Sequence, residues 1–186
     1  ARAAGIDKIF VFRFNSGPTA FFASYDITEK DLSPKPVAIA QAQAARRLYD
    51  SVFTRKLAIG GATWAYLFEA QGKPLVIYWN YENEANEGAT ISVGAKADSL
   101  AAEDLMGNSI PMDSRGGEGL VLPLNGAPVY LTSDKLSGDE ILQLFEKAYA
   151  PGEVVFREGD PGKGLFVVLE GGVAITRATP DGEKLL

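Results

Sequence analysis

The residues that could carry chemistry in this sequence are carboxylates and aromatic rings, because the chain contains no cysteine and no histidine. Thiolate nucleophiles, disulfides, histidine-based triads and the usual zinc sites are therefore excluded. Glu82, Glu84 and Glu87 lie close together in one stretch. Paired carboxylates hydrolyse glycosidic bonds, but blocks of like charge usually face water. We interpret this stretch as a solvated loop, and we predict no catalytic residue, metal site or cofactor.

Aromatic residues form a second candidate site. Trp64, Tyr66 and Phe68 occupy alternate positions, and Trp79 and Tyr81 follow in the next apolar run. Such rings usually fill the core of a β-sandwich, but exposed rings can form a platform on which sugars stack. The pattern favours the core. Solvent exposure of Trp64, Trp79 and Tyr81 would instead favour carbohydrate contact.

A glycine-rich stretch at residues 159–164, Gly-Asp-Pro-Gly-Lys-Gly, resembles a phosphate-binding loop. The P-loop needs four residues between its glycines, followed by Lys and Ser or Thr. Here two residues intervene, and a glycine follows the lysine. We therefore predict no nucleoside triphosphate site.

Charge and hydropathy exclude two classes of partner. The net charge is -6 and the sequence pI is about 4.8, which argues against nucleic acid and anionic membranes as ligands. No apolar run approaches the ~18 residues that a membrane-spanning helix needs. The sequence starts without Met and stops inside a predicted strand, so we expect an internal piece of a longer protein.

The elements that must position these residues follow from hydrophobic periodicity. A buried strand is predicted at residues 9–14 and an amphipathic helix at 36–52, where Val52 closes an apolar stripe. The period then changes to two, and glycine and asparagine turns separate short strands, as in a β-sandwich. A helix is predicted within 133–148, with acidic residues first. The predicted strands lie at 64–69, 75–79, 89–93, 99–104, 109–112, 120–124, 129–132, 154–157, 165–169 and 173–177.

Residues 1–132 resemble the C-terminal end of a (β/α)8-barrel glycoside hydrolase with its accessory β-sandwich. The resemblance is carried by Gly-Ile-Asp-Lys at 5–8 before the first strand, Ser-Pro-Lys-Pro at 33–36, Asp-Leu-Met-Gly-Asn at 104–108 and Pro-Val-Tyr-Leu at 128–131. It implies that the catalytic carboxylates lie on earlier barrel strands. Arg13 and Asn15 are then either remnants of a sugar pocket or an ordinary surface pair.

Residues 149–186 resemble the N-terminal part of a cyclic-nucleotide-binding domain of Crp/Fnr type. The matching segments are 149–160, Tyr-Ala-Pro-Gly-Glu-Val-Val-Phe-Arg-Glu-Gly-Asp, the apolar run at 165–168, and Thr-Pro-Asp-Gly-Glu at 179–183. We expect Gly159, Gly162 and Gly171 to adopt positive φ in turns. The resemblance implies that a later helix holds the cyclic phosphate. The motif residues are Gly152, Gly159, Asp160, Gly162 and Gly171.

The sequence thus predicts a mainly β chain with minor α, in which an antiparallel β-sandwich follows a strand-helix remnant of a (β/α)8 barrel and precedes a partial β-roll. The expected divisions are 1–56 (barrel remnant), 57–132 (sandwich), 133–148 (linker helix) and 149–186 (truncated β-roll).

The predicted function is a non-catalytic fragment that joins the glycosidase-type sandwich to the start of a cyclic-nucleotide sensor. The alternatives are part of a glycoside hydrolase acting on carbohydrate, or a carbohydrate-binding sandwich using Trp64, Trp79 and Tyr81. The expected partners are carbohydrate, a cyclic nucleotide only in a longer chain, and a second copy paired weakly through the open edge at 184–186.

Overall fold

The computed structural model describes residues 2–6, 26–59, 62–81, 90–93, 99–112, 120–145, 149–157, 159, 168, 171–179 and 182–185. The chain divides into two compact units, Ala1–Ala150 and Pro151–Leu186. Within the described residues, no helix has both the length and the apolar character needed to cross a bilayer.

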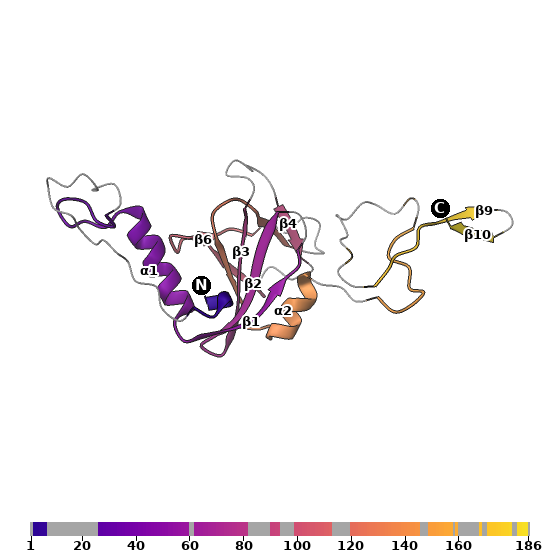
Figure 1. Cartoon of the computed structure of the whole chain (residues 1–186), viewed down its shortest axis with the longest axis horizontal. Helices are drawn as coiled ribbons and strands as arrows, with labels where there is room; N and C mark the ends of the chain where they lie inside the picture. The colour runs from indigo at the N-terminus through magenta and orange to yellow at the C-terminus, as the bar shows by residue number, and fades with distance from the viewer. Residues whose placement is uncertain are drawn as a thin grey trace. The chain divides into compact units, whose positions relative to one another are not determined.

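A six-stranded antiparallel sheet forms the first unit, with strand order β1-β2-β3-β8-β5-β6 (Figure 1). Its hairpin between β2 and β3 closes with Gln71 and Gly72, both at positive φ. A two-residue loop of this kind matches the right-handed twist of the strands that it joins. The strands are β1 (Ser51–Leu57), β2 (Thr63–Ala70), β3 (Lys73–Asn80), β5 (Ala101–Glu103), β6 (Ser109–Ile110) and β8 (Val129–Thr132).

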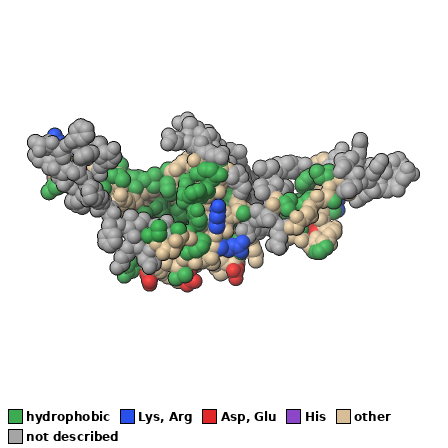
Figure 2. Space-filling model, viewed as in Figure 1, with side chains coloured by type: hydrophobic (Ala, Val, Ile, Leu, Met, Phe, Trp, Pro, Cys, Tyr) green, Lys and Arg blue, Asp and Glu red, His purple; other side chains and the backbone are tan. Residues whose placement is uncertain are grey.

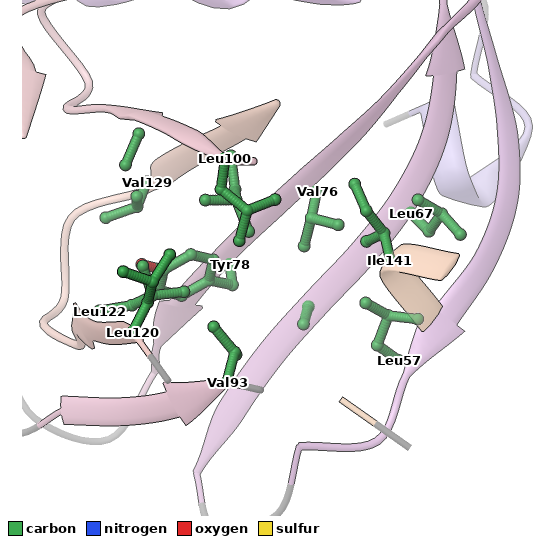
Figure 3. Packing of buried hydrophobic residues seen from close by; sticks show 13 residues of the cluster. Leu57, Leu67, Val76, Tyr78, Val93, Leu100, Leu120, Leu122, Val129 and Ile141 are labelled. Carbon is green, nitrogen blue, oxygen red and sulfur yellow. The ribbon is translucent and has the colours of Figure 1, made fainter. Parts of the chain in front are cut away.

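A second, two-stranded sheet of β4 (Thr90–Val93) and β7 (Leu120–Pro123) contributes to the core on one face of the large sheet. The core between them is apolar and fully buried (Figure 3). Tyr78 packs there beside Leu120 and Leu122, and its hydroxyl has no hydrogen-bond partner among the residues that the structure describes. The core residues are Leu57, Ala65, Leu67, Val76, Tyr78, Val93, Leu100, Ala102, Leu120, Leu122, Val129, Leu131 and Ile141. This architecture confirms the predicted fold class, mainly β with minor α.

Helix α2 (Gly138–Phe145) closes the same core with Ile141, which lies near Leu57 and Leu67 in Figure 3. It begins at a capping box. The Ser137 hydroxyl accepts a hydrogen bond from the Glu140 amide at 3.2 Å, and the Glu140 carboxylate accepts one from the Ser137 amide at 2.8 Å. This exchange satisfies backbone donors that a helix start otherwise leaves unpaired. The helix predicted within 133–148 is confirmed.

Helix α1 (Pro36–Leu48) begins with proline in its first turn, as predicted, but ends four residues earlier than the predicted 36–52. The Ser51 hydroxyl donates to the carbonyl of Leu48 at 2.9 Å, and Asp50 takes a φ of 51°. The chain then enters β1, where Val52 pairs with Glu69. Val52 was expected on the apolar face of the helix; its side chain is instead 67% exposed. The predicted strand at 9–14 lies outside the described residues.

The opposite face of the six-stranded sheet holds a smaller cluster centred on Phe68, Leu75, Ile77 and Tyr130. Ala44 and Leu48 of α1 pack against it, and so does Ala3 of the short 3-10 helix η1 (Arg2–Ala4). Both faces of β3 are therefore buried because its alternate residues serve different cores.

The second unit contains the hairpin of β9 (Thr176–Thr179) and β10 (Gly182–Leu185). Of the turn predicted at 180–182, residues 180 and 181 lie outside the described residues. These strands form a sheet of their own and do not extend the sheet of the first unit. The strand predicted at 154–157 is not formed. Its apolar run, Val154 to Phe156, satisfies the local pattern, but a strand also needs a neighbour to pair with. Most of the strand predicted at 165–169 lies outside the described residues.

Candidate functional site

A row of aromatic side chains lies on the α1-bearing face of the six-stranded sheet, here called the aromatic strip: Phe53, Trp64, Tyr66, Trp79 and Tyr81. Trp64 and Tyr66 share this face because residues two apart in a strand point the same way. The register of β2 and β3 sets Trp64 opposite Trp79. Tyr81 follows directly after β3.

The rings of the strip touch one another in tilted pairs. Ring centroids are 5.6 Å apart for Trp64 and Trp79, 5.4 Å for Trp64 and Tyr81, and 5.7 Å for Tyr66 and Trp79. Their planes meet at 61°, 51° and 35°, respectively. Offset or edge contacts of this kind are favourable for aromatic rings. They hold the strip as one contiguous cluster.

The aromatic residues predicted from the sequence as core or carbohydrate contacts fall into two groups, one buried and one exposed to solvent. Phe68 is buried, as the core interpretation predicts. Trp64 is 40% exposed and Tyr81 is 51% exposed, while Trp79 is half-buried. The core interpretation is therefore wrong for Trp64 and Tyr81, whose rings face solvent.

Lys56 brings a positive charge to the strip, and sequence reasoning missed it. Its Nζ lies 5.9 Å from the centre of the Trp64 ring, within the range of a cation–π contact. A bulge between Phe53 and Arg55 shifts the register of β1 and sets Lys56 opposite Tyr66. Figure 2 shows hydrophobic side chains gathered on the visible face of the first unit, with Lys or Arg side chains beside them.

A polar cluster around Glu103 fixes α1 to the edge of the same face. The Glu103 carboxylate accepts hydrogen bonds from Gln43 Nε2 at 2.6 Å and Arg47 Nε at 3.0 Å, and it pairs with a terminal nitrogen of Arg47 as well. Arg46 lies 3.9 Å away. Burial alone would raise the pKa of Glu103, but the bonds and charges of these partners lower it overall. Glu103 is thus held in its charged form as a tether.

Four other carboxylates serve the local structure in the same way. Asp104 accepts hydrogen bonds from the Asn108 side chain and from the amides of Met106 and Asn108, all at 2.8 Å. The Lys73 Nζ donates to Asp134 at 2.6 Å. Their hydrogen bonds lower the pKa of each of these groups: Asp31, Asp104, Asp134 and Glu140. A glycosidase acid needs the opposite, a pKa raised toward neutrality.

The predicted nucleotide-domain motif is described in part. Gly152, Gly159 and Gly171 have φ of 81°, 91° and 86°, a region that side-chain-bearing residues rarely adopt. No atom lies within 4 Å of the position where a Cβ would stand, so these glycines are required by their backbone conformation. The other candidates lie outside the described residues: Asp160, Gly162, Arg13, Asn15, Glu82, Glu84 and Glu87. Among described residues, no three acidic side chains gather in a metal-binding group.

Comparison with known proteins finds both expected resemblances. The family model of the cyclic nucleotide-binding domain matches residues 146–186. A family 39 glycoside hydrolase from the gut symbiont Bacteroides cellulosilyticus WH2 matches with 30% sequence identity and a TM-score of 0.52, over 64% of this chain. Both sequence-based resemblances are confirmed. The match covers 24% of the hydrolase, so this chain corresponds to about a quarter of its length.

A GH30 endoxylanase from Clostridium papyrosolvens C71 gives a weaker match, with 11% identity and a TM-score of 0.41 over 59% of this chain and 30% of that chain. No curated protein matches the sequence.

Proposed function

We propose that the first unit is a non-catalytic accessory β-sandwich of glycoside-hydrolase type, which contacts carbohydrate through the aromatic strip. The observation that carries the proposal is the exposure of Trp64 and Tyr81 within a contiguous ring cluster. Sugars present apolar C–H faces that pack on aromatic rings, while the polar edges of Trp and Tyr keep hydrogen-bonding capacity.

The tilt of the rings favours one kind of carbohydrate ligand. Trp64 and Tyr81 meet at 51°, and Trp64 and Trp79 meet at 61°. Rings inclined in this way do not form a flat row, and a flat row is what the surface of a crystalline polysaccharide would require. They suit a single sugar ring at the end of a soluble chain.

The state of the carboxylates supports the absence of glycosidase chemistry. Glycosidases use two carboxyl groups across the scissile bond, one of them with a raised pKa. In this unit Glu103 is held by Arg47 and Gln43, and Asp104 is held by its own loop. Both pKa values are lowered. Hydrolysis by this chain is the competing function, and turnover of aryl glycosides that is lost on Glu82→Gln or Glu84→Gln would establish it.

Calorimetry with a panel of soluble neutral oligosaccharides tests the carbohydrate proposal. We expect binding by the full chain, weakened by about tenfold or more in Trp64→Ala and Tyr81→Ala, because each removes one wall of the ring cluster. Val52→Ala changes an exposed side chain of β1 away from the ring contacts and serves as the matched control. Absence of heat with every sugar, or equal weakening by the control, would contradict the proposal.

We propose that the second unit is the start of a cyclic-nucleotide sensor module and does not bind the nucleotide by itself. A cyclic phosphate needs an anion site made of backbone amides and a charge-assisted arginine contact. The described residues of Pro151–Leu186 form one hairpin and no helix. We expect calorimetry of the full chain with cyclic AMP to give no signal, and a micromolar Kd would overturn this part.

A further inference from the structure

We propose that Asn125 is a site of spontaneous deamidation, and that the isoaspartate formed there displaces Tyr81 at the end of the aromatic strip. Asparagine is among the chemically labile residues of proteins. Asn125 and Gly126 form the sole Asn-Gly pair of the sequence. The modification goes beyond carbohydrate binding, because it needs no sugar ligand.

The Asn-Gly pair lies on the loop that joins β7 of the small sheet to β8 of the large sheet. Asn125 and Gly126 are both exposed there, so water reaches them. Glycine has no side chain to keep its amide nitrogen away from a neighbouring carbonyl carbon. Among the described residues, none accepts a hydrogen bond from the Gly126 amide. That nitrogen is therefore available as a nucleophile.

The side chain of Asn125 is held in a way that favours attack on its carbonyl carbon. Its Oδ1 accepts a hydrogen bond from the Ala127 amide at 2.8 Å. A backbone N–H aimed at this oxygen stabilises the negative charge that develops on it when a nucleophile adds to Cγ, as in an oxyanion hole. The same bond restricts the side-chain torsions, so less entropy is lost when the ring closes.

The reaction has two steps and consumes only water. The Gly126 nitrogen bonds to Cγ of Asn125, the Cγ–Nδ2 bond breaks, and the amide proton leaves with Nδ2 as ammonia. The product is a five-membered succinimide. Water then opens one of the two C–N bonds of this ring. Cleavage at Cγ gives aspartate, and cleavage at the main-chain carbonyl gives isoaspartate, in which the main chain runs through the former side chain.

The isoaspartate product removes a support of the aromatic strip. The main-chain carbonyl of Asn125 accepts a hydrogen bond from the Asn80 amide at 2.8 Å, and Tyr81 follows Asn80 directly. In isoaspartate this carbonyl becomes a free carboxylate on a lengthened main chain, so the contact with Asn80 changes. The ring centroids of Tyr81 and Trp64 are 5.4 Å apart, so a shift of Tyr81 alters the surroundings of Trp64. The aspartate product keeps the main chain intact.

Asn108 offers a comparison within the same molecule. It is exposed as well, but its Nδ2 donates to Oδ2 of Asp104 at 2.8 Å. The negative charge of this carboxylate opposes the charge that attack would create on the asparagine side chain. The next residue, Ser109, bears a side chain and pairs with Glu103 in the sheet. We therefore expect Asn108 to persist where Asn125 is modified.

Peptide mapping by mass spectrometry tests the modification in the full chain, incubated over time in mildly alkaline buffer. We expect deamidation at Asn125 to be at least about tenfold faster than at Asn108, and to slow by about tenfold in Gly126→Ala, whose methyl group hinders the attack. Enzymatic methylation of the free α-carboxylate distinguishes isoaspartate from aspartate. Equal rates at Asn125 and Asn108, or an unchanged rate in Gly126→Ala, would overturn the proposal.

Tryptophan fluorescence tests the effect on the strip without any sugar, so its outcome does not depend on carbohydrate binding. The chain has two tryptophans, Trp64 and Trp79, and both belong to the strip. We expect their emission to change in step with the isoaspartate content. Freshly prepared Asn125→Asp reproduces the other product and should match the unmodified protein. Constant emission while isoaspartate accumulates, or an equal change in Asn125→Asp, would refute the link to Tyr81.

Discussion

The two units of this chain use apolar residues in opposite ways. In the first unit, Tyr78, Val76 and Leu131 are fully buried between two sheets and a helix. In the second unit, Val173 and Ile175 face solvent. Both segments resemble a known family, and the second one matches a family model.

The physical difference lies in the number of layers. A sheet is stable when an apolar face packs on another element. The six-stranded sheet has β4, β7 and α2 on one face and α1 on the other. A two-stranded hairpin without such a layer is marginal in water. Matched substitutions in the two units, compared by their effect on stability, will test this difference.

Truncation of a core leucine should give the largest effect. Leu131→Ala leaves a cavity at a fully buried position of β8, and we expect it to lower the free energy of unfolding by about 2–5 kcal/mol. Ile175→Ala removes a similar side chain that is 63% exposed. This substitution should change the free energy of unfolding by less than about 0.5 kcal/mol. Urea unfolding followed by circular dichroism measures both free energies. Similar losses of unfolding free energy in Leu131→Ala and Ile175→Ala would contradict the expected difference between the two units.

Glycine substitutions should give the second largest effect. A Cβ at Gly107, where φ is 88°, would lie 3.1 Å from the Gln43 side chain. Gly107→Ala therefore combines backbone strain with a clash at the α1 tether, and we expect a loss of about 2 kcal/mol. Gly72→Ala meets no atom within 4 Å at a φ of 75°, and should cost about 1 kcal/mol from strain alone.

Gly152→Ala is the counterpart in the second unit, with φ of 81° and open space around it. It should leave the unfolding transition of the first unit unchanged. A shift of that transition by Gly152→Ala as large as that by Gly107→Ala would show that the units do not unfold independently.

The smallest predicted effect is a pH-dependent one at Glu103. Its pKa in the folded unit lies below the ordinary 4.5, so the charged form contributes stability above that value. The contribution is lost as the pH falls through the lowered folded pKa. Glu103→Gln should therefore cost about 1 kcal/mol at neutral pH and nothing in strong acid. Thermal melts of both proteins across this pH range give the difference, and a constant gap would contradict the assignment.

Sequence reasoning succeeded where the signal is local. Alternation at 64–69 predicted β2, the apolar run at 75–79 after a turn predicted β3, and acidic residues in the first turn predicted α2. It failed where distant segments meet. Gln43 and Arg47 reach Glu103 across 60 and 56 positions of sequence, respectively, and no local pattern marks that pairing. Lys56 reaches Trp64 only because of the bulge in β1. The stretch at 154–157 shows the converse: its apolar run predicts a strand, but no described strand pairs with it.

The buried hydroxyl of Tyr78, to which no described residue hydrogen-bonds, has a kinetic consequence. Burial raises the pKa of this phenol above its ordinary value, and the closed core keeps hydroxide away from it. In alkaline solution the phenolate of Tyr78 therefore forms only in molecules whose sandwich has opened. Phenolate absorbs ultraviolet light differently from phenol. After a jump to high pH, the absorbance of Tyr78 therefore reports the rate at which the sandwich opens. The slow growth of its absorbance records how often the two sheets of the sandwich separate.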